Sequence, residues 1–162
     1  MTDLSNLAEN LRSESRPGFQ LFEQFCDVAV GNSMLEDVTA LARAAASGEA
    51  VTPAGISAEN QKMTGNNPED LISKVFSLHR RPAFESFLKD TRVRDIVIAA
   101  IGQEVDCFLS QFIFKNPGAL GQPWHQDSYY FPFTPARPVV GLWLAITRAT
   151  LENGCLHVLP GS

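Results

Sequence analysis

Histidine and aspartate stand two residues apart in the segment Pro123-Trp124-His125-Gln126-Asp127, which lies between two predicted strands. In an extended chain, residues two apart project to the same side, so His125 and Asp127 can hold one ion. A neutral imidazole and a carboxylate, joined by a histidine from a distant strand, form the facial triad of Fe(II) oxygenases, which leaves metal positions open for cosubstrate and oxygen. The pair therefore predicts an iron site.

Other chemistries can be written for the same residues. An H-x-D pattern alone is weak evidence, because roughly one histidine in twenty has an aspartate two positions on by composition. A nucleophilic enzyme would pair Cys155 with His157, or Ser128 with His125. Such close neighbours do not by themselves supply an oriented base and an oxyanion hole, so this alternative is less favoured.

The elements that must position these residues begin with helices. Apolar residues from Phe19 to Ala29 recur at three- and four-residue steps, which predicts a helix that Gly31 ends. Ser33 and Glu36 form a capping box, which predicts the start of a second helix that runs toward Gly48. Residues 48–69 are rich in Gly, Pro and Asn, which predicts a long loop.

The pattern changes near residue 105. Helical periodicity returns at residues 82–89 and 92–101, and Gly102 is placed to end the second of these helices. Residues 105–114, 139–147 and 155–159 are then dense in Val, Ile, Leu and Phe, which predicts strands. Helices followed by strands indicate an α+β fold. We expect one domain, with a flexible lead-in at 1–17, a mainly helical part at 18–104 and the first strands of a sheet structure at 105–162.

The composition narrows the class of protein. The 162 residues are 44% hydrophobic and 19% charged, with a net charge of −5, as in a globular domain. No Lys- or Arg-rich run predicts nucleic acid binding, and no apolar run is long enough to span a membrane. The cysteines, Cys26, Cys107 and Cys155, are odd in number and widely spaced, which favours a reducing, cytoplasmic location.

A series of motifs in fixed order carries a resemblance to a known family. Ile-Phe-Lys-Asn-Pro-Gly at 113–118 is followed by PWHQDSYYFPF at 123–133, a predicted strand with Trp143 at its centre, and ENGCLHVLPGS at 152–162. This order resembles the phytanoyl-CoA dioxygenase family of Fe(II)- and 2-oxoglutarate-dependent oxygenases. The likeness extends weakly back to Leu71 and covers a little over half of the chain.

The resemblance implies roles for particular residues. His125 and Asp127 become iron ligands, and Lys74 stands where the family has a lysine that contacts 2-oxoglutarate. Gln111 and Trp143 match strand positions that line the cosubstrate pocket. Without the family, Lys74 would read as a solvated lysine, and Trp143 as an aromatic residue that fills a core.

The same resemblance implies a double-stranded β-helix (jelly roll) and hydroxylation of a small molecule by molecular oxygen. Halogenating relatives carry a small residue at the position of Asp127, so the carboxylate favours hydroxylation. The family's third iron ligand and an arginine for the cosubstrate lie beyond the Leu-Pro-Gly-Ser segment, and His157 does not match that ligand. We therefore expect an incomplete oxygenase domain that is inactive alone. The alternative is a non-catalytic jelly-roll module that binds a small molecule or a partner.

Overall fold

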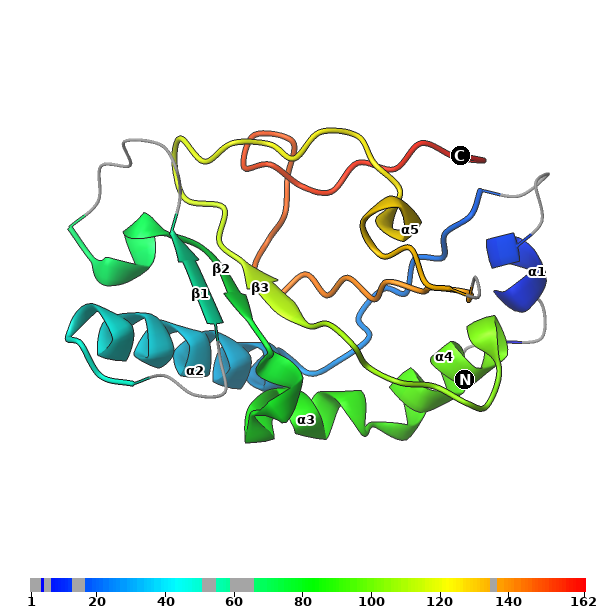
Figure 1. Ribbon diagram of the computed structural model, residues 1–162, viewed down its shortest axis with the longest axis horizontal. Helices are drawn as coiled ribbons and strands as arrows, with labels where there is room; N and C mark the ends of the chain where they lie inside the picture. Colours follow the sequence, from blue (N-terminus) through cyan, green and yellow to red (C-terminus); the bar gives the residue numbers. More distant parts are fainter. Residues whose placement is uncertain (1–3, 5–6, 13–16, 51–54, 59–65, 135–136) are drawn as a thin grey trace.

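A small antiparallel sheet, with helices against one of its faces, organises the chain. The computed structural model describes residues 4, 7–12, 17–50, 55–58, 66–134 and 137–162. The strands β1 (Gly55–Ala58), β2 (Ile72–Phe76) and β3 (Gln111–Ile113) pair in the order β1-β2-β3. Figure 1 shows α2 and α3 on one side of this sheet and the chain after β3 on the other. Helices beside a small antiparallel sheet confirm the predicted α+β class.

The long helix α2 (Val28–Ala46) replaces the two helices predicted for this region. Its N-cap is Asp27, whose carboxylate accepts a hydrogen bond from the Ala29 backbone N–H at 2.8 Å, so Ser33 does not start a helix. Gly31 does not end a helix either. It lies buried within α2 beside Ile146, whose side chain is 3.6 Å from the position that a Cβ would take, an ordinary contact distance.

The helix packs on β2. Val38, Leu41 and Ala42 of α2 form one buried cluster with Ile72 and Val75 of β2 and with Leu78. In the pairing with β1, Ser57 faces Lys74 and Ala58 faces Ile72, so the register skips Ser73. A bulge of this kind interrupts strand alternation and accounts for Ile72 and Val75 both reaching the helical side. Strand β2 and strand β1 were not predicted, and β1 lies within the expected long loop.

Two of the predicted helices are confirmed. They are α3 (Pro82–Leu88) and α4 (Thr91–Ile101), and Gly102 ends α4 with a positive φ of 100°. Short 3₁₀ turns, η1 (Pro68–Leu71) and η2 (Leu78–Arg80), flank β2. Part of the expected lead-in is the short helix α1 (Leu7–Arg12), in which Leu7 is buried and which contacts α4.

The chain after β3 departs most from the prediction. The structure has no strand at residues 139–147 or 155–159, and only Gln111–Ile113 of the predicted strand 105–114 forms a strand. A strand exists through hydrogen bonds to a neighbouring strand, and in the described residues these segments have none. The only regular element after β3 in the described residues is the single helical turn α5 (Asp127–Tyr130).

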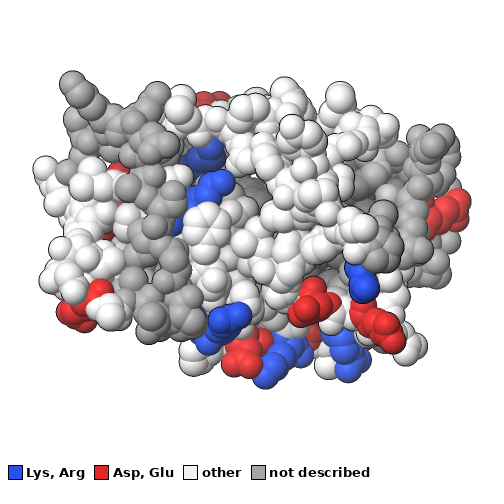
Figure 2. All heavy atoms as spheres, in the orientation of Figure 1, with Lys and Arg blue, Asp and Glu red and all other residues white. Residues whose placement is uncertain are grey.

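Charged side chains are unevenly distributed over the surface. Figure 2 shows basic and acidic residues intermixed along the edge formed by α3 and α4, where Lys89 pairs with Glu85 and Arg92 with Asp90. The part of this face formed by the chain after β3 is mostly uncharged. Within the described residues, no helix combines the length and the apolar character that a bilayer crossing requires.

Candidate metal centre

The structure brings the side chains of His125 and Asp127 together. His125 Nε2 lies 3.5 Å from Asp127 Oδ1, and the two side chains are 27% and 56% exposed. Metal–nitrogen and metal–oxygen bonds of about 2.0–2.2 Å at a right angle put two donor atoms about 3 Å apart. The observed separation is close to that value, so the two side chains fit two adjacent positions around one metal ion.

A backbone contact sets the tautomer of His125. Its Nδ1 lies 2.7 Å from the carbonyl oxygen of Pro123. A carbonyl can only accept, so Nδ1 must carry the hydrogen, and in the neutral ring Nε2 keeps its lone pair. Metal-binding histidines are commonly held in this way by a second hydrogen bond. The free nitrogen is the one that faces the carboxylate of Asp127.

A helical turn, rather than the predicted extended chain, places the two donors. Gln126 is extended, with φ −104° and ψ 136°, and Asp127 is the first residue of α5. Tyr130 is three residues after Asp127 and therefore lies on the same side of the turn. Its ring packs against the His125 ring, with centroids 5.0 Å apart. The pairing of His125 with Asp127 is as expected, but the local backbone that achieves it is not.

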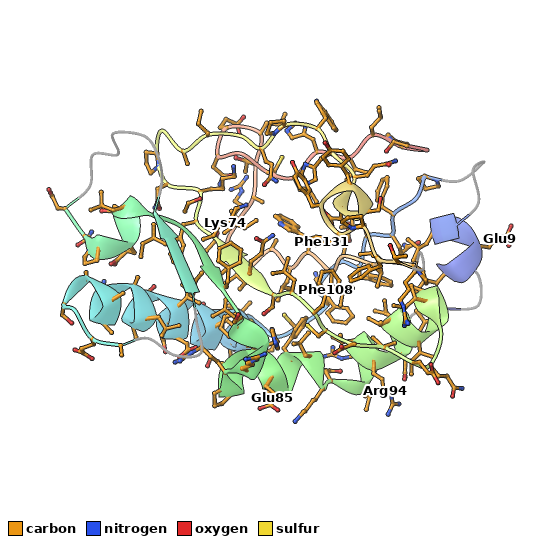
Figure 3. The ribbon with its side chains drawn as sticks, viewed as in Figure 1. Glu9, Lys74, Glu85, Arg94, Phe108 and Phe131 are labelled. Carbon is orange, nitrogen blue, oxygen red and sulfur yellow. The ribbon has the colours of Figure 1, made fainter. Side chains whose placement is uncertain are left out.

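Aromatic packing fixes this turn to the chain that leads into β3. The rings of Phe131 and Phe133 both stand edge-on to Phe108, at 4.9 and 5.2 Å between centroids. Figure 3 shows Phe108 and Phe131 facing each other between α5 and the segment that precedes β3. Edge-to-face pairs of this kind contribute roughly 0.5–1.5 kcal/mol each beyond the area that they bury.

Gly141 is a residue of the site that the sequence reasoning missed. A Cβ placed on Gly141 would lie 3.2 Å from Asp127 Oδ2, which is tighter than nearly all real contacts. The carboxylate therefore rests against a backbone that has no side chain at this point. The available signal was a glycine inside the apolar run at 139–147, because such a glycine often marks a close approach.

Lys74 and Gln111 share one face of the sheet. Lys74 faces Ile113 across the β2-β3 pair, and Gln111 is two residues before Ile113, so both project to the side opposite Val75 and the helices. Lys74 Nζ donates a hydrogen bond to Gln122 Oε1 at 3.2 Å. Gln122 immediately precedes Pro123, so Lys74 reaches the segment that carries His125 and Asp127.

The remaining candidates lie apart from this pair. Trp143 is 52% exposed and makes no hydrogen bond or ring contact in the described part of the chain. His157 packs on Trp124, with centroids 6.5 Å apart, and its Nε2 lies 3.9 Å from Cys155 Sγ. No group of three His, Cys, Asp or Glu side chains able to hold a metal occurs among the described residues.

His79 is a partly buried residue that contacts Ser110. Its Nδ1 lies 2.7 Å from Ser110 Oγ, which also accepts the His79 backbone N–H at 2.8 Å. Both contacts are partly buried, and they join η2 to the residue before β3.

Neither nucleophilic alternative gains support, since Ser128 makes no hydrogen bond to His125 in the described residues and the Cys155–His157 contact is long.

Comparisons with known proteins agree with one another. The sequence model of the family "Phytanoyl-CoA dioxygenase (PhyH)" matches residues 15–162. The rat protein "Phytanoyl-CoA dioxygenase domain-containing protein 1" is 37% identical over 99 residues, which cover 59% of this chain and 34% of the rat protein. The Arabidopsis thaliana protein "Phytanoyl-CoA dioxygenase" is 46% identical over 94 residues, which cover 56% of this chain and 33% of that protein.

The matched region spans about a third of the length of these relatives. No solved structure matches the chain.

Proposed function

Because the chain belongs to the phytanoyl-CoA dioxygenase family, we propose that it is part of an Fe(II)- and 2-oxoglutarate-dependent oxygenase that hydroxylates a small molecule. One observation carries the metal assignment. His125 Nε2, with its lone pair free, faces Asp127 Oδ1 at 3.5 Å, while the other ring nitrogen is held by Pro123. These are two of the three protein ligands in the facial triad of such oxygenases.

The chain's own residues bind and orient in this scheme. His125 and Asp127 hold the iron, and the Pro123 carbonyl keeps the proton on Nδ1 so that Nε2 stays available. Iron bound there supplies the activation of dioxygen, with oxidation of 2-oxoglutarate to succinate and carbon dioxide while the substrate gains a hydroxyl group. Phe108, Phe131 and Phe133 keep the ligand turn in place through their packing.

Lys74 and Gln111, which share one face of the sheet, form the cosubstrate side of the proposed site, and Trp143 is added to it on the family resemblance alone. The ammonium of Lys74 suits the far carboxylate of 2-oxoglutarate, because a charged donor makes stronger hydrogen bonds to a carboxylate than a neutral one. We further propose that the complete fold is a double-stranded β-helix, with β2 and β3 in one of its sheets. A reducing, cytoplasmic location is proposed because Cys26, Cys107 and Cys155 are all unpaired.

The test is cosubstrate turnover in the full-length protein. His125→Ala and Asp127→Ala should each abolish iron-dependent succinate formation and weaken anaerobic Co(II) binding, because each removes one of the metal ligands. His157→Ala is the matched control, since this imidazole contacts Trp124 and Cys155 rather than Asp127. Unchanged turnover in both ligand variants, or loss in the His157 variant alone, would contradict the assignment.

The alternative is a non-catalytic module that binds a small molecule. Trp124 and Tyr129, at 72% and 80% exposed, offer aromatic surface to such a ligand beside His125. The two functions differ in one measurement, because only an oxygenase consumes 2-oxoglutarate in an iron-dependent reaction.

A further inference from the structure

One hydrogen bond joins the sheet to the segment that bears the metal-binding pair. Lys74 Nζ of β2 donates to Gln122 Oε1 at 3.2 Å, although the two residues are 48 positions apart. Figure 3 shows Lys74 between the sheet and the segment that follows β3. Lys74 is partly buried, and in the described residues no carboxylate lies within ion-pair distance of it. Its charge is therefore met by a neutral amide oxygen.

One amide contacts this ammonium on the open face of the sheet, and a second lies on a neighbouring position of the same face. Gln111 is a diagonal neighbour of Lys74 across the β2-β3 pair, and diagonal neighbours in antiparallel sheets lie roughly 7–8 Å apart, within reach of long side chains. The Nε2 of Gln122 makes no hydrogen bond in the described part of the chain. An ammonium with one amide in contact and a second within reach, both able to donate, is a suitable binding site for a carboxylate.

We propose that, in the free protein, the side chain of Gln122 occupies the position on Lys74 where a carboxylate ligand binds. Once the carboxylate has bound, Gln122 becomes a second hydrogen-bond donor to it. The inference rests on the proposed function, since it takes the far carboxylate of 2-oxoglutarate as the ligand. A carboxylate oxygen accepts more strongly from an ammonium than an amide oxygen does, so it displaces Oε1. The displaced side chain can then turn its Nε2 toward the second carboxylate oxygen.

This exchange links the cosubstrate to the metal ligands. Gln122 is bonded directly to Pro123, whose carbonyl oxygen fixes the tautomer of His125. A change in the position of Gln122 therefore occurs one residue from the group that orients a metal ligand. Gln122 acts as a specificity-determining residue for the dicarboxylate, whereas Lys74 supplies the charge.

Glutarate is the suitable probe, because it keeps the far carboxylate of 2-oxoglutarate and lacks the 2-oxo group that chelates iron. Its affinity for the full-length protein without metal is measured by NMR titration of amide signals. Gln122→Glu should weaken binding by about tenfold or more, because its carboxylate pairs with Lys74 and competes with the ligand. Gln122→Leu should weaken it by only about threefold to tenfold, through loss of one donor.

Lys115→Ala controls for net charge, since the Lys115 ammonium donates to the Leu120 carbonyl oxygen in the same segment and its loss should leave glutarate affinity unchanged. Equal affinities for the wild-type, Glu and Leu proteins overturn the inference, as does failure of the wild-type protein to bind glutarate. The proposed function fails separately, if Co(II) binding survives His125→Ala. The dispersed amide spectrum of each variant shows that it is folded.

Discussion

Two regions of the molecule are similarly rich in apolar residues, but one region buries many of them and the other exposes many of them. In the described residues, the buried hydrophobic residues all lie between Leu7 and Ala100, and the chain from residue 105 onward contributes none. That second region instead holds most of the large exposed hydrophobic residues, which include Val105, Phe108, Leu120, Trp124, Tyr129, Trp143, Leu151, Leu156 and Leu159. We call these the packed region (residues 7–101) and the open region (residues 105–162).

The difference shows what each kind of element needs. A helix satisfies its own backbone hydrogen bonds, so α2 and α4 need only one surface against which to bury their apolar faces. A strand needs at least one neighbouring strand to pair its backbone, as well as a cover for its apolar face. The apolar runs at 139–147 and 155–159 have no strand pairing in the described residues, and many of their side chains are exposed.

The candidate site joins the two regions. Lys74 lies on β2, which the packed region holds through Ile72 and Val75. His125 and Asp127 lie on the open region, attached mainly through the rings around Phe108. The proposed cosubstrate side thus lies on the packed sheet, while the proposed metal side is attached through fewer contacts. Four measurements can break or sharpen this comparison.

The largest expected effect is on stability in the packed region. Leu78 is 1% exposed, so Leu78→Ala should lower the free energy of unfolding by about 2–5 kcal/mol through lost burial and a cavity. Leu156 in the open region is 56% exposed, so Leu156→Ala should change the free energy of unfolding by less than about 0.5 kcal/mol. Urea denaturation measures both. A cost at Leu156 as large as at Leu78 would mean that the open region is covered in solution.

A smaller loss is expected at the ion pair between α2 and α3. The guanidinium of Arg81, which is the N-cap residue of α3, donates through Nε and Nη2 to both carboxylate oxygens of Asp37, and both side chains are about three-quarters buried. Asp37→Asn should destabilise the protein by about 1–2 kcal/mol, because Arg81 then loses a charged partner. Glu36→Gln, at an exposed neighbouring position of α2, is the control. Equal urea midpoints for these two variants would show that the ion pair does not stabilise the packed region.

The third measurement concerns the contact between Gly141 and Asp127. A methyl group at position 141 would meet Asp127 Oδ2 at 3.2 Å, so Gly141→Ala should shift the carboxylate and weaken Co(II) binding by about tenfold. Stability should change little, because the open region buries little there. Gly121→Ala is the control, since nothing lies within 4 Å of its added methyl group. Calorimetric titration compares the two, and equal affinities would show that Asp127 does not rest on this backbone.

Sequence reasoning succeeded where local physics decides the outcome. The periodicity of α3 and α4 predicted both helices, and Gly102 was rightly placed at the end of α4. It failed at Gly31 and Ser33, because the helix is capped at Asp27 and both residues are interior positions of α2. The approach of His125 to Asp127 was expected from their spacing, but on an extended chain rather than at the start of α5. The contacts of Gln122 and Gly141 were not, because they join segments that are distant in sequence or that lack a recognisable pattern.

The smallest expected effect is the pH dependence of the stability that Asp90, the N-cap residue of α4, contributes. It also tests the packed region. The Arg92 guanidinium and the Arg92 backbone N–H hydrogen-bond to Asp90 and lower the pKa of its carboxyl group from 3.8 to about 2. A carboxyl group whose pKa is lower in the folded state stabilises the protein above the unfolded value, and this contribution is lost as the pH falls from near 4 to 2. The difference in urea midpoint between the wild-type protein and Asp90→Asn should therefore be constant above about pH 5 and shrink as the pH falls through that window. Asp95→Asn, on the exposed side of α4, controls for net charge. A wild-type advantage that stays the same down to pH 2 would show that Asp90 acts through the shape of its side chain rather than its charge.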